Sequence, residues 1–392
     1  MRNNFIVHGW RDINHSFSIV NQNQLYYLSK NTDINLFHFD EKKYNNNWTK
    51  FTNSANLDDN KAKVINNISN PKIDSYYNSI VYSINFPFLS YFNKGVEKKI
   101  YHFIVTEFGL TNDEIIGSVD RIKKFNNSNE FIITPSKWSC NKIIDCGFDS
   151  KKVITIPHGI DKENFFPLED LTILQLRSSL NLTTDSFCFL NLGSMTYNKG
   201  IDILIEAYAI LFNKFPHIKI ILKDQNKLYG LKADQIINDI LINKPTLDSS
   251  ALRKSIIVIS DNLSTSQMNS LYNLVDCYIS PYRAEGFNLP VLEAMACGCH
   301  VITTSGGATD DFVDLLIHDW YKVESIKSAN TSINSKYLNK NTNFHLSPCL
   351  DSIISNMEKA LDNKNKNISL SRHISDNYDW ELISKVLIKN TI

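Results

Sequence analysis

Short apolar segments rich in β-branched and aromatic residues alternate with amphipathic segments along most of the chain. FIVHGW (5–10) is followed by an amphipathic stretch over 15–30, and FCFLNLG (187–193) by another over 201–215. Apolar residues three and four positions apart in the longer stretches predict one buried face of a helix. Because parallel strands need a long crossover connection, this rotation predicts parallel sheets covered by helices.

The rotation is interrupted once, over His158–Asp170, where Gly, Pro and charged residues cluster. A chain of 392 residues exceeds what one hydrophobic core usually serves. We therefore predict a first Rossmann-like domain over 1–165 and a second over 166–372. A final helix within 373–392 is expected to pack back toward the first domain, and the polar stretch 328–348 is expected to be a loop.

Composition excludes several classes of protein. The net charge is zero, so nothing in the bulk electrostatics favours a nucleic-acid partner. No apolar stretch approaches the length of a membrane span, which predicts a cytoplasmic protein and leaves open a peripheral contact at the inner face of the membrane.

The seven cysteines sit mostly in apolar runs, as expected for buried thiols in a reducing compartment. Neither a zinc-ligand pattern nor an Asp-x-Asp motif occurs, so no metal site is predicted.

The stretch SPYRAEGFNLPVLEAMACGCHVITTSGG (280–307) contains a strand end, a glycine and a helix start. Pro290 suits the first turn of a helix, where a missing N–H costs nothing. Gly286, Phe287, Asn288 and Leu289 then place backbone N–H groups at the helix N-terminus, which is a ready site for an anion.

Two glutamates flank this cradle, Glu285 just before it and Glu293 one turn inside the helix. A carboxylate accepts hydrogen bonds from a pair of sugar hydroxyls, and amides suit a phosphate between them. The ligand that this arrangement describes is a nucleotide sugar. The alternative is structural, because the helix dipole stabilises an acidic residue near an N-terminus by about 0.3–1 kcal/mol without any function.

Two more glycine-bearing turns follow predicted strands of the same domain. One runs from Gly193 to Gly200 and contains Lys199, and the other is Ser305–Gly307. Neither is a Walker loop, and no G-x-G-x-x-G occurs in the chain. A lysine at the end of a parallel strand can meet a diphosphate through charge-assisted hydrogen bonds, although a loop lysine is more often simply solvated.

From about Phe131 to about Asp314 the sequence resembles the retaining glycosyltransferases of family 4. The matching pieces are LNLGSMTYNKGIDILIEAY, SLYNLVDCYISPYRAEGFNLPVLEAMACGCHVITTSGG and, before them, TPSKWSCNKIIDCGFDSKKVITIPHGIDKENFFP. The resemblance implies the α/β GT-B fold, with two doubly wound Rossmann-like domains facing across a cleft.

The resemblance also implies roles for residues of the second domain. Glu285 would lie by the hydroxyls of the donor sugar, Glu293 would hold the ribose hydroxyls, and Lys199 would bind the diphosphate and stabilise the leaving nucleotide. Gly193 and Ser194 would line the donor together with the amides of Gly286, Phe287, Asn288 and Leu289.

The chain departs from the family at Ser194, where an arginine is usual. Either Lys199 acts with helix dipoles alone, or another cation such as Arg283 substitutes, or activity is weak. On the acceptor side, Gly9 occupies the position of the family's glycine turn after the first strand. Glu107, at the end of the predicted strand IYHFIVTE, is a second acceptor-side candidate, with an exposed structural carboxylate as the alternative.

We therefore expect a metal-independent hexosyl- or related glycosyltransferase that retains anomeric configuration. It would need no cofactor, would use a UDP- or GDP-linked donor, and would act in glycan or cell-surface polysaccharide synthesis on a glycan, lipid-linked or small-molecule acceptor. The alternatives are a non-catalytic GT-B subunit, a nucleotide-sugar epimerase and a sugar phosphorylase.

Overall fold

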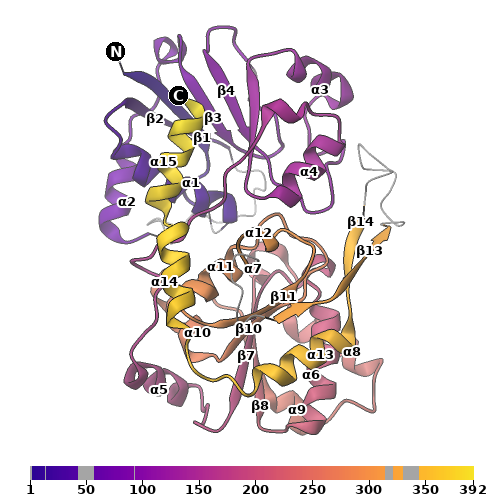
Figure 1. Cartoon of the computed structure of the whole chain (residues 1–392). Helices are drawn as coiled ribbons and strands as arrows, with labels where there is room; N and C mark the ends of the chain where they lie inside the picture. Colours follow the sequence, from indigo (N-terminus) through magenta and orange to yellow (C-terminus); the bar gives the residue numbers. More distant parts are fainter. Residues whose placement is uncertain (1, 14, 43–56, 92, 314–320, 330–343) are drawn as a thin grey trace. The chain divides into compact units, whose positions relative to one another are not determined.

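The computed structural model describes residues 2–13, 15–42, 57–91, 93–313, 321–329 and 344–392. They form two compact units, each built around its own six-stranded parallel sheet (Figure 1). The first unit combines Met1–Asp161 with Tyr378–Ile392, and the second combines Lys162–Ala329 with Phe344–Asn377. The predicted fold class, two doubly wound parallel α/β units, is confirmed.

The sheet of the first unit has the strand order β2-β1-β3-β4-β5-β6. The strands are β1 (Asn3–Gly9), β2 (Ile34–Asp40), β3 (Ile80–Ile84), β4 (Lys99–Phe103), β5 (Glu130–Thr134) and β6 (Val153–Thr155). All five residues of β3 are buried, as expected for a central strand covered by helices on both faces.

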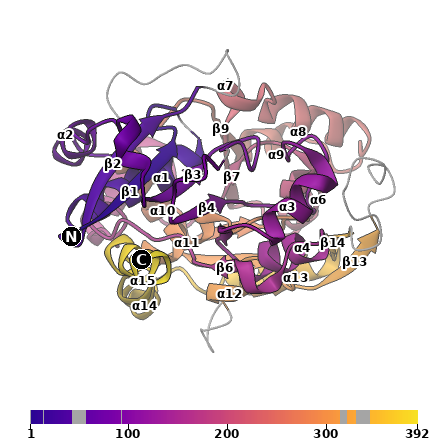
Figure 2. The same cartoon turned by 90° about the horizontal axis from the view of Figure 1, so that it is seen from above.

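Helices of the first unit begin and end where local chemistry favours it. They are α1 (Ser16–Ser29), α2 (Asp59–Asn66), α3 (Ser118–Asn126), α4 (Lys137–Asp145) and α15 (Trp380–Thr391), with 3₁₀ turns η1 (Ile73–Tyr76) and η2 (Ser150–Lys152). The Ser136 hydroxyl caps α4 by accepting from the Ser139 N–H at 3.1 Å. Gly147 follows α4 with a φ of +100°, a left-handed conformation that ends a helix at little cost in glycine. Helices α3 and α4 lie near each other (Figure 2) and share one apolar cluster.

The C-terminal helix α15 belongs to the first unit, where it lies beside α1 (Figure 1). The N–H of Ile160 donates to the carbonyl of Tyr378 at 2.6 Å. A side chain on Gly159 would come within 2.6 Å of the Trp380 ring. The absence of a side chain at residue 159 therefore allows the start of α15 to pack directly on the backbone of the first unit.

The sheet of the second unit has the order β12-β11-β10-β7-β8-β9. The strands are β7 (Phe187–Gly193), β8 (Ile218–Asp224), β9 (Ile256–Ile259), β10 (Cys277–Ser280), β11 (His300–Thr304) and β12 (Tyr321–Val323). The chain adds β8 and β9 on one side of β7 and then returns to add β10, β11 and β12 on the other side. The strand order thus reverses between β7 and β10, and ligands of open α/β sheets bind beside the carboxyl ends of strands at such a point.

Helices cover both faces of this second sheet. They are α5 (Asp170–Ser179), α6 (Ile201–Lys214), α7 (Asn226–Tyr229), α8 (Ala233–Ile242), α9 (Ser250–Ser255), α10 (Thr265–Leu274), α11 (Leu289–Ala296), α12 (Asp310–Val313), α13 (Leu350–Ala360) and α14 (Ile368–Asn377), with a 3₁₀ turn η3 (Tyr197–Lys199). Residues of α6, α8 and α13 form one core cluster with alternate residues of β7, β8 and β10, such as Phe189, Leu222 and Ile279.

The prediction of a loop over 328–348 is wrong at both ends of that stretch. β13 (Ser325–Ala329) and β14 (Phe344–Pro348) form a two-stranded antiparallel sheet, and the residues between them lie outside the described part of the chain. The mostly exposed burial pattern of β13 explains why hydrophobic periodicity gave no signal for a strand.

Candidate functional site

The loop after β7 is shaped by two glycines. Gly193 has a φ of +149° and Gly200 a φ of +68°, conformations that favour glycine. A Cβ on Gly200 would lie 2.0 Å from the carbonyl oxygen of Pro281. Glycine at residue 200 therefore lets this loop pack against the chain leaving β10, and Lys199 immediately precedes it.

This packing brings Lys199 to Glu285. The Lys199 ammonium lies 2.5 Å from a carboxylate oxygen of Glu285, and the two side chains are 21% and 8% exposed. The aliphatic part of Lys199 lies over Gly193, where a Cβ would be 3.8 Å from its Cδ and Cε. The pair lies beside the carboxyl ends of β7 and β10, where ligands of open α/β sheets bind.

The N-terminus of α11 lies just after this pair in the chain. Asn288 has a left-handed conformation (φ 74°, ψ 65°), and no side chain caps the helix. The Asn288 side-chain amide instead donates to the Ser280 hydroxyl at 3.0 Å, which ties the turn to the end of β10. Phe287 is buried, with its ring 5.1 Å from that of Phe312. Gly286 is buried beside it and Leu289 is half-buried.

Glu293 lies one turn into α11 and is partly buried. Its carboxylate accepts a hydrogen bond from the Tyr272 hydroxyl at 2.7 Å. Burial raises the pKa of Glu293 to about 7, and the Tyr272 hydrogen bond acts in the opposite direction. The first turn of α11 holds no acidic residue, so Glu293 lies beyond the turn to which the structural alternative applies.

Arg283 does not fit the role of a substitute phosphate cation. Its guanidinium donates to both carboxylate oxygens of Asp202, at 2.6 and 2.8 Å, and lies 3.9 Å from the ring centre of Tyr197. Ser194, where the family has arginine, shares a hydrogen bond with Thr196 at 2.9 Å. The charge of Arg283 is therefore already compensated within the fold.

The third glycine-bearing turn follows β11. Gly306 has a φ of +87°, and its N–H donates to the Asp310 carboxylate at 2.8 Å. A Cβ on Gly307 would lie 2.4 Å from the Tyr282 hydroxyl. Packing against Tyr282 thus accounts for Gly307 without any ligand.

The two acceptor-side candidates have evident structural roles in the first unit. Gly9 ends β1, and a Cβ there would lie 2.9 Å from the Asn21 side-chain nitrogen, so glycine permits α1 to pack closely on the strand. Glu107 does not end a strand as predicted, because β4 ends at Phe103 and Glu107 lies in a bend beyond it. Its backbone carbonyl accepts from the Trp138 indole at 2.8 Å.

Sequence reasoning passed over two polar features at strand ends. In the first unit, His8 is buried, and its ring nitrogens form hydrogen bonds with the Glu41 carboxylate and the Tyr76 hydroxyl, each at 3.0 Å. In the second unit, Lys223 is a buried lysine one residue before the end of β8. The sequence feature that could have indicated Lys223 is a cationic residue near the end of the apolar run IKIILKD, at the predicted ligand-binding edge of the sheet.

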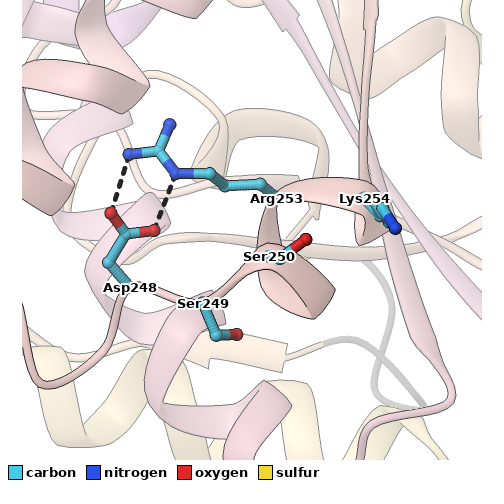
Figure 3. A pocket seen from close by; sticks show the side chains of 5 residues that line it. All are labelled: Asp248, Ser249, Ser250, Arg253 and Lys254. Atoms are coloured by element: carbon cyan, nitrogen blue, oxygen red, sulfur yellow. Dashed lines mark hydrogen bonds and ion pairs between the residues drawn. The ribbon is translucent and has the colours of Figure 1, made fainter.

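A surface pocket lies elsewhere on the second unit, at the start of α9 (Figure 3). Its lining residues are Asp248, Ser249, Ser250, Arg253 and Lys254. Arg253 donates to both oxygens of Asp248, so these two charges of the pocket compensate each other. The pocket contains none of the predicted site residues.

In the part of the chain that the structure describes, no helix is long and apolar enough to cross a membrane.

Residues 173–346 match the family described as glycosyl transferases group 1. The mannosylfructose-phosphate synthase of Agrobacterium fabrum is 27% identical over 165 residues, which are 42% of this chain and 35% of that protein. The lipopolysaccharide 1,2-N-acetylglucosaminetransferase of Salmonella typhimurium is 25% identical over 262 residues, which are 65% of this chain and 60% of that protein. The chain thus matches less than two thirds of the length of either curated relative.

Solved structures resemble the whole chain. A glycosyltransferase from Rickettsia africae superposes with a TM-score of 0.68 at 12% identity, covering 100% of this chain and 98% of its own. Anabaena HepE, in complex with UDP and glucose, gives 0.64 at 12% identity and covers 99% of both chains. Residues 173–346 therefore belong to the glycosyl transferases group 1, and the chain as a whole has the GT-B fold.

Proposed function

We propose that this protein transfers a sugar from a nucleotide-sugar donor to a hydroxyl group of a glycan, lipid-linked or small-molecule acceptor, with retention of anomeric configuration. The observation that carries the proposal is the Lys199–Glu285 pair, 2.5 Å apart at the switch point of the second sheet. A relative named as an N-acetylglucosaminetransferase and a neighbour in complex with UDP and glucose support the same class of reaction.

Lys199 and Glu285 would position the two groups that the breaking bond joins, the diphosphate and the donor sugar. An ammonium group carries three N–H donors, so Lys199 can bond Glu285 and a diphosphate oxygen together. Glu285 would accept hydrogen bonds from hydroxyls of the donor sugar. The N-terminus of α11 would add backbone amides to the phosphate, and Glu293 would hold the ribose hydroxyls.

In the reaction, the bond between the anomeric carbon and the diphosphate oxygen breaks, and its electron pair leaves with the diphosphate. The acceptor hydroxyl oxygen forms the new bond on the same face of the sugar, and its proton passes to the diphosphate. Lys199 and the amides stabilise the charge that develops on the leaving group. Because no Asp-x-Asp motif occurs in the sequence, we propose that these groups suffice without a divalent ion.

The test is turnover with a panel of UDP-, GDP- and ADP-linked sugars, with and without a chelator. Lys199→Ala should lower turnover by about 10²-fold or more, as loss of one transition-state donor does. Lys214→Ala is a matched control, because Lys214 pairs with Glu358 at the surface of the same unit, with 61% of its side chain exposed. Equal turnover of Lys199→Ala and the parent protein would refute the assigned role.

A non-catalytic subunit is the second candidate, favoured by Ser194 in place of the usual arginine. Such a protein would bind a nucleotide sugar and neither transfer nor hydrolyse it. Analysis of the products also separates the epimerase alternative, in which the sugar of the donor changes and no acceptor is consumed.

A further inference from the structure

Lys223 lies at the ligand-binding edge of the second sheet. It is the residue before the last of β8 and pairs in register with Leu192 of β7. Its neighbour Leu222 belongs to the core under α6 and α8. Because side chains alternate along a strand, Lys223 lies on the opposite face of the sheet.

The face of the sheet that carries Lys223 is also the face on which Glu293 lies. The register joins Tyr278 of β10 to Leu190 of β7 and Leu190 to Ile221 of β8, so Tyr278 and Lys223 share one face. The ring of Tyr278 lies 5.9 Å from that of Tyr272, whose hydroxyl bonds Glu293. Lys223 therefore lies on the same side of the sheet as the proposed ribose-binding carboxylate.

The fold does not neutralise Lys223 with an ion pair. Its side chain is buried, with 5% of the residue exposed, and its ammonium donates to the backbone carbonyl of Asp224 at 2.6 Å. Within the described ranges no carboxylate oxygen lies within 4.0 Å of that ammonium. The Asp224 carboxylate instead accepts from the Ala233 N–H at 3.1 Å and the Ser260 hydroxyl at 2.9 Å.

Such a lysine costs folding stability. An ammonium group loses its hydration on burial, and lysines are rarely fully buried unless they are paired. Burial lowers the pKa of Lys223, and the charges of the Asp224 and Asp261 carboxylates act in the opposite direction. A feature that destabilises the fold and sits at a ligand-binding edge is expected where function requires it.

We propose that Lys223 binds the base of the nucleotide donor, by donating a hydrogen bond to a carbonyl oxygen of that base. This inference rests on the proposed function. The Lys199–Glu285 pair and the start of α11 place the sugar and diphosphate at β7 and β10. Lys223 lies on β8, on the side of β7 away from β10, which is the direction in which the far end of an extended donor would continue.

The chemistry of an ammonium group selects among bases. Uracil and guanine carry exocyclic carbonyl oxygens that accept hydrogen bonds, whereas the exocyclic group of adenine is an amino group that donates and only its ring nitrogens accept. Lys223 therefore favours a UDP- or GDP-linked sugar over an ADP-linked one.

Titration calorimetry with UDP, GDP and ADP tests this assignment. The parent protein should bind UDP or GDP at least about 10-fold more tightly than ADP, as expected for one hydrogen bond to a charged donor. Lys223→Met keeps the length of the side chain and removes the charge, so it should abolish that preference and leave ADP binding unchanged. Lys214→Met is the control, because Lys214 is 61% exposed on α6 and pairs with Glu358; its affinities should equal those of the parent.

Thermal unfolding without nucleotide guards against a structural explanation. Lys223→Met should melt at the same temperature as the parent or higher, because it removes a buried charge. An equal loss of affinity for all three nucleotides would place Lys223 on the diphosphate and overturn the proposal, as would no loss at all. Failure of the parent protein to bind any of the three would instead refute the proposed function.

Discussion

Replacing Glu293 with glutamine should remove a pH-dependent loss of stability. Burial raises the pKa of Glu293 from 4.5 to about 7 in the folded chain. Between these values the unfolded chain releases the proton while the folded chain keeps it. The parent protein is therefore fully stable, with respect to this group, below about pH 4.5, loses stability as the pH rises, and has lost the whole contribution above about pH 7.

The size of the loss follows from the two pKa values. Each pKa unit corresponds to about 1.4 kcal/mol, so a rise from 4.5 to about 7 is worth about 3 kcal/mol. Glutamine cannot ionise, and its amide oxygen can still accept the hydrogen bond from Tyr272. Glu293→Gln should thus match the parent at about pH 4 and exceed its stability by about 3 kcal/mol at about pH 8.

Scanning calorimetry at the two pH values measures this difference. A unit of 150–250 residues shifts its melting temperature by about 2–4 °C per kcal/mol, so the variant should melt about 6–12 °C above the parent at about pH 8. Glu358→Gln is the control, because Glu358 is 40% exposed on α13 of the same unit, and it should show no such pH dependence. A difference between Glu293→Gln and the parent that is equal at both pH values would refute the burial argument.

Three further results are expected. Tyr272→Phe removes a hydrogen bond that lowers the pKa of Glu293, so a carboxyl NMR titration should show that pKa rising further; an unchanged value would mean the bond is not made in solution. Nucleotide binding at about pH 6 should release a proton from Glu293, because ribose hydroxyls favour the ionised carboxylate; calorimetry in buffers of different ionisation enthalpy would detect it, and no release would count against ribose contact. Gly200→Ala places a Cβ 2.0 Å from the carbonyl oxygen of Pro281 and should destabilise the second unit by about 1–3 kcal/mol or more, so an unchanged melting temperature would contradict the packing described for that loop.

The architecture of both units could be predicted from the sequence because hydrophobic periodicity reports burial directly. The apolar runs FIVHGW and FCFLNLG became β1 and β7, and Gly147 ended α4 as expected. The strand β13 was not predicted because most of its residues are exposed, so hydrophobic periodicity carried no information there.

Pairwise contacts within the candidate site could not be predicted from the sequence. Lys199 and Glu285 are far apart in the chain and meet only because β10 lies beside β7. The compensation of Arg283 by Asp202 likewise depends on how the loop after β7 packs against the chain leaving β10. Glu107 was misplaced because the apolar run containing it continues past the point where β4 stops pairing.

The most direct test of the account is a crystal structure with a UDP- or GDP-linked sugar bound. The account predicts a diphosphate oxygen within about 2.7–3.2 Å of the Lys199 ammonium, with the sugar hydroxyls on Glu285 and the ribose on Glu293. A nucleotide sugar bound elsewhere, with Lys199 still contacting only the protein, would contradict it.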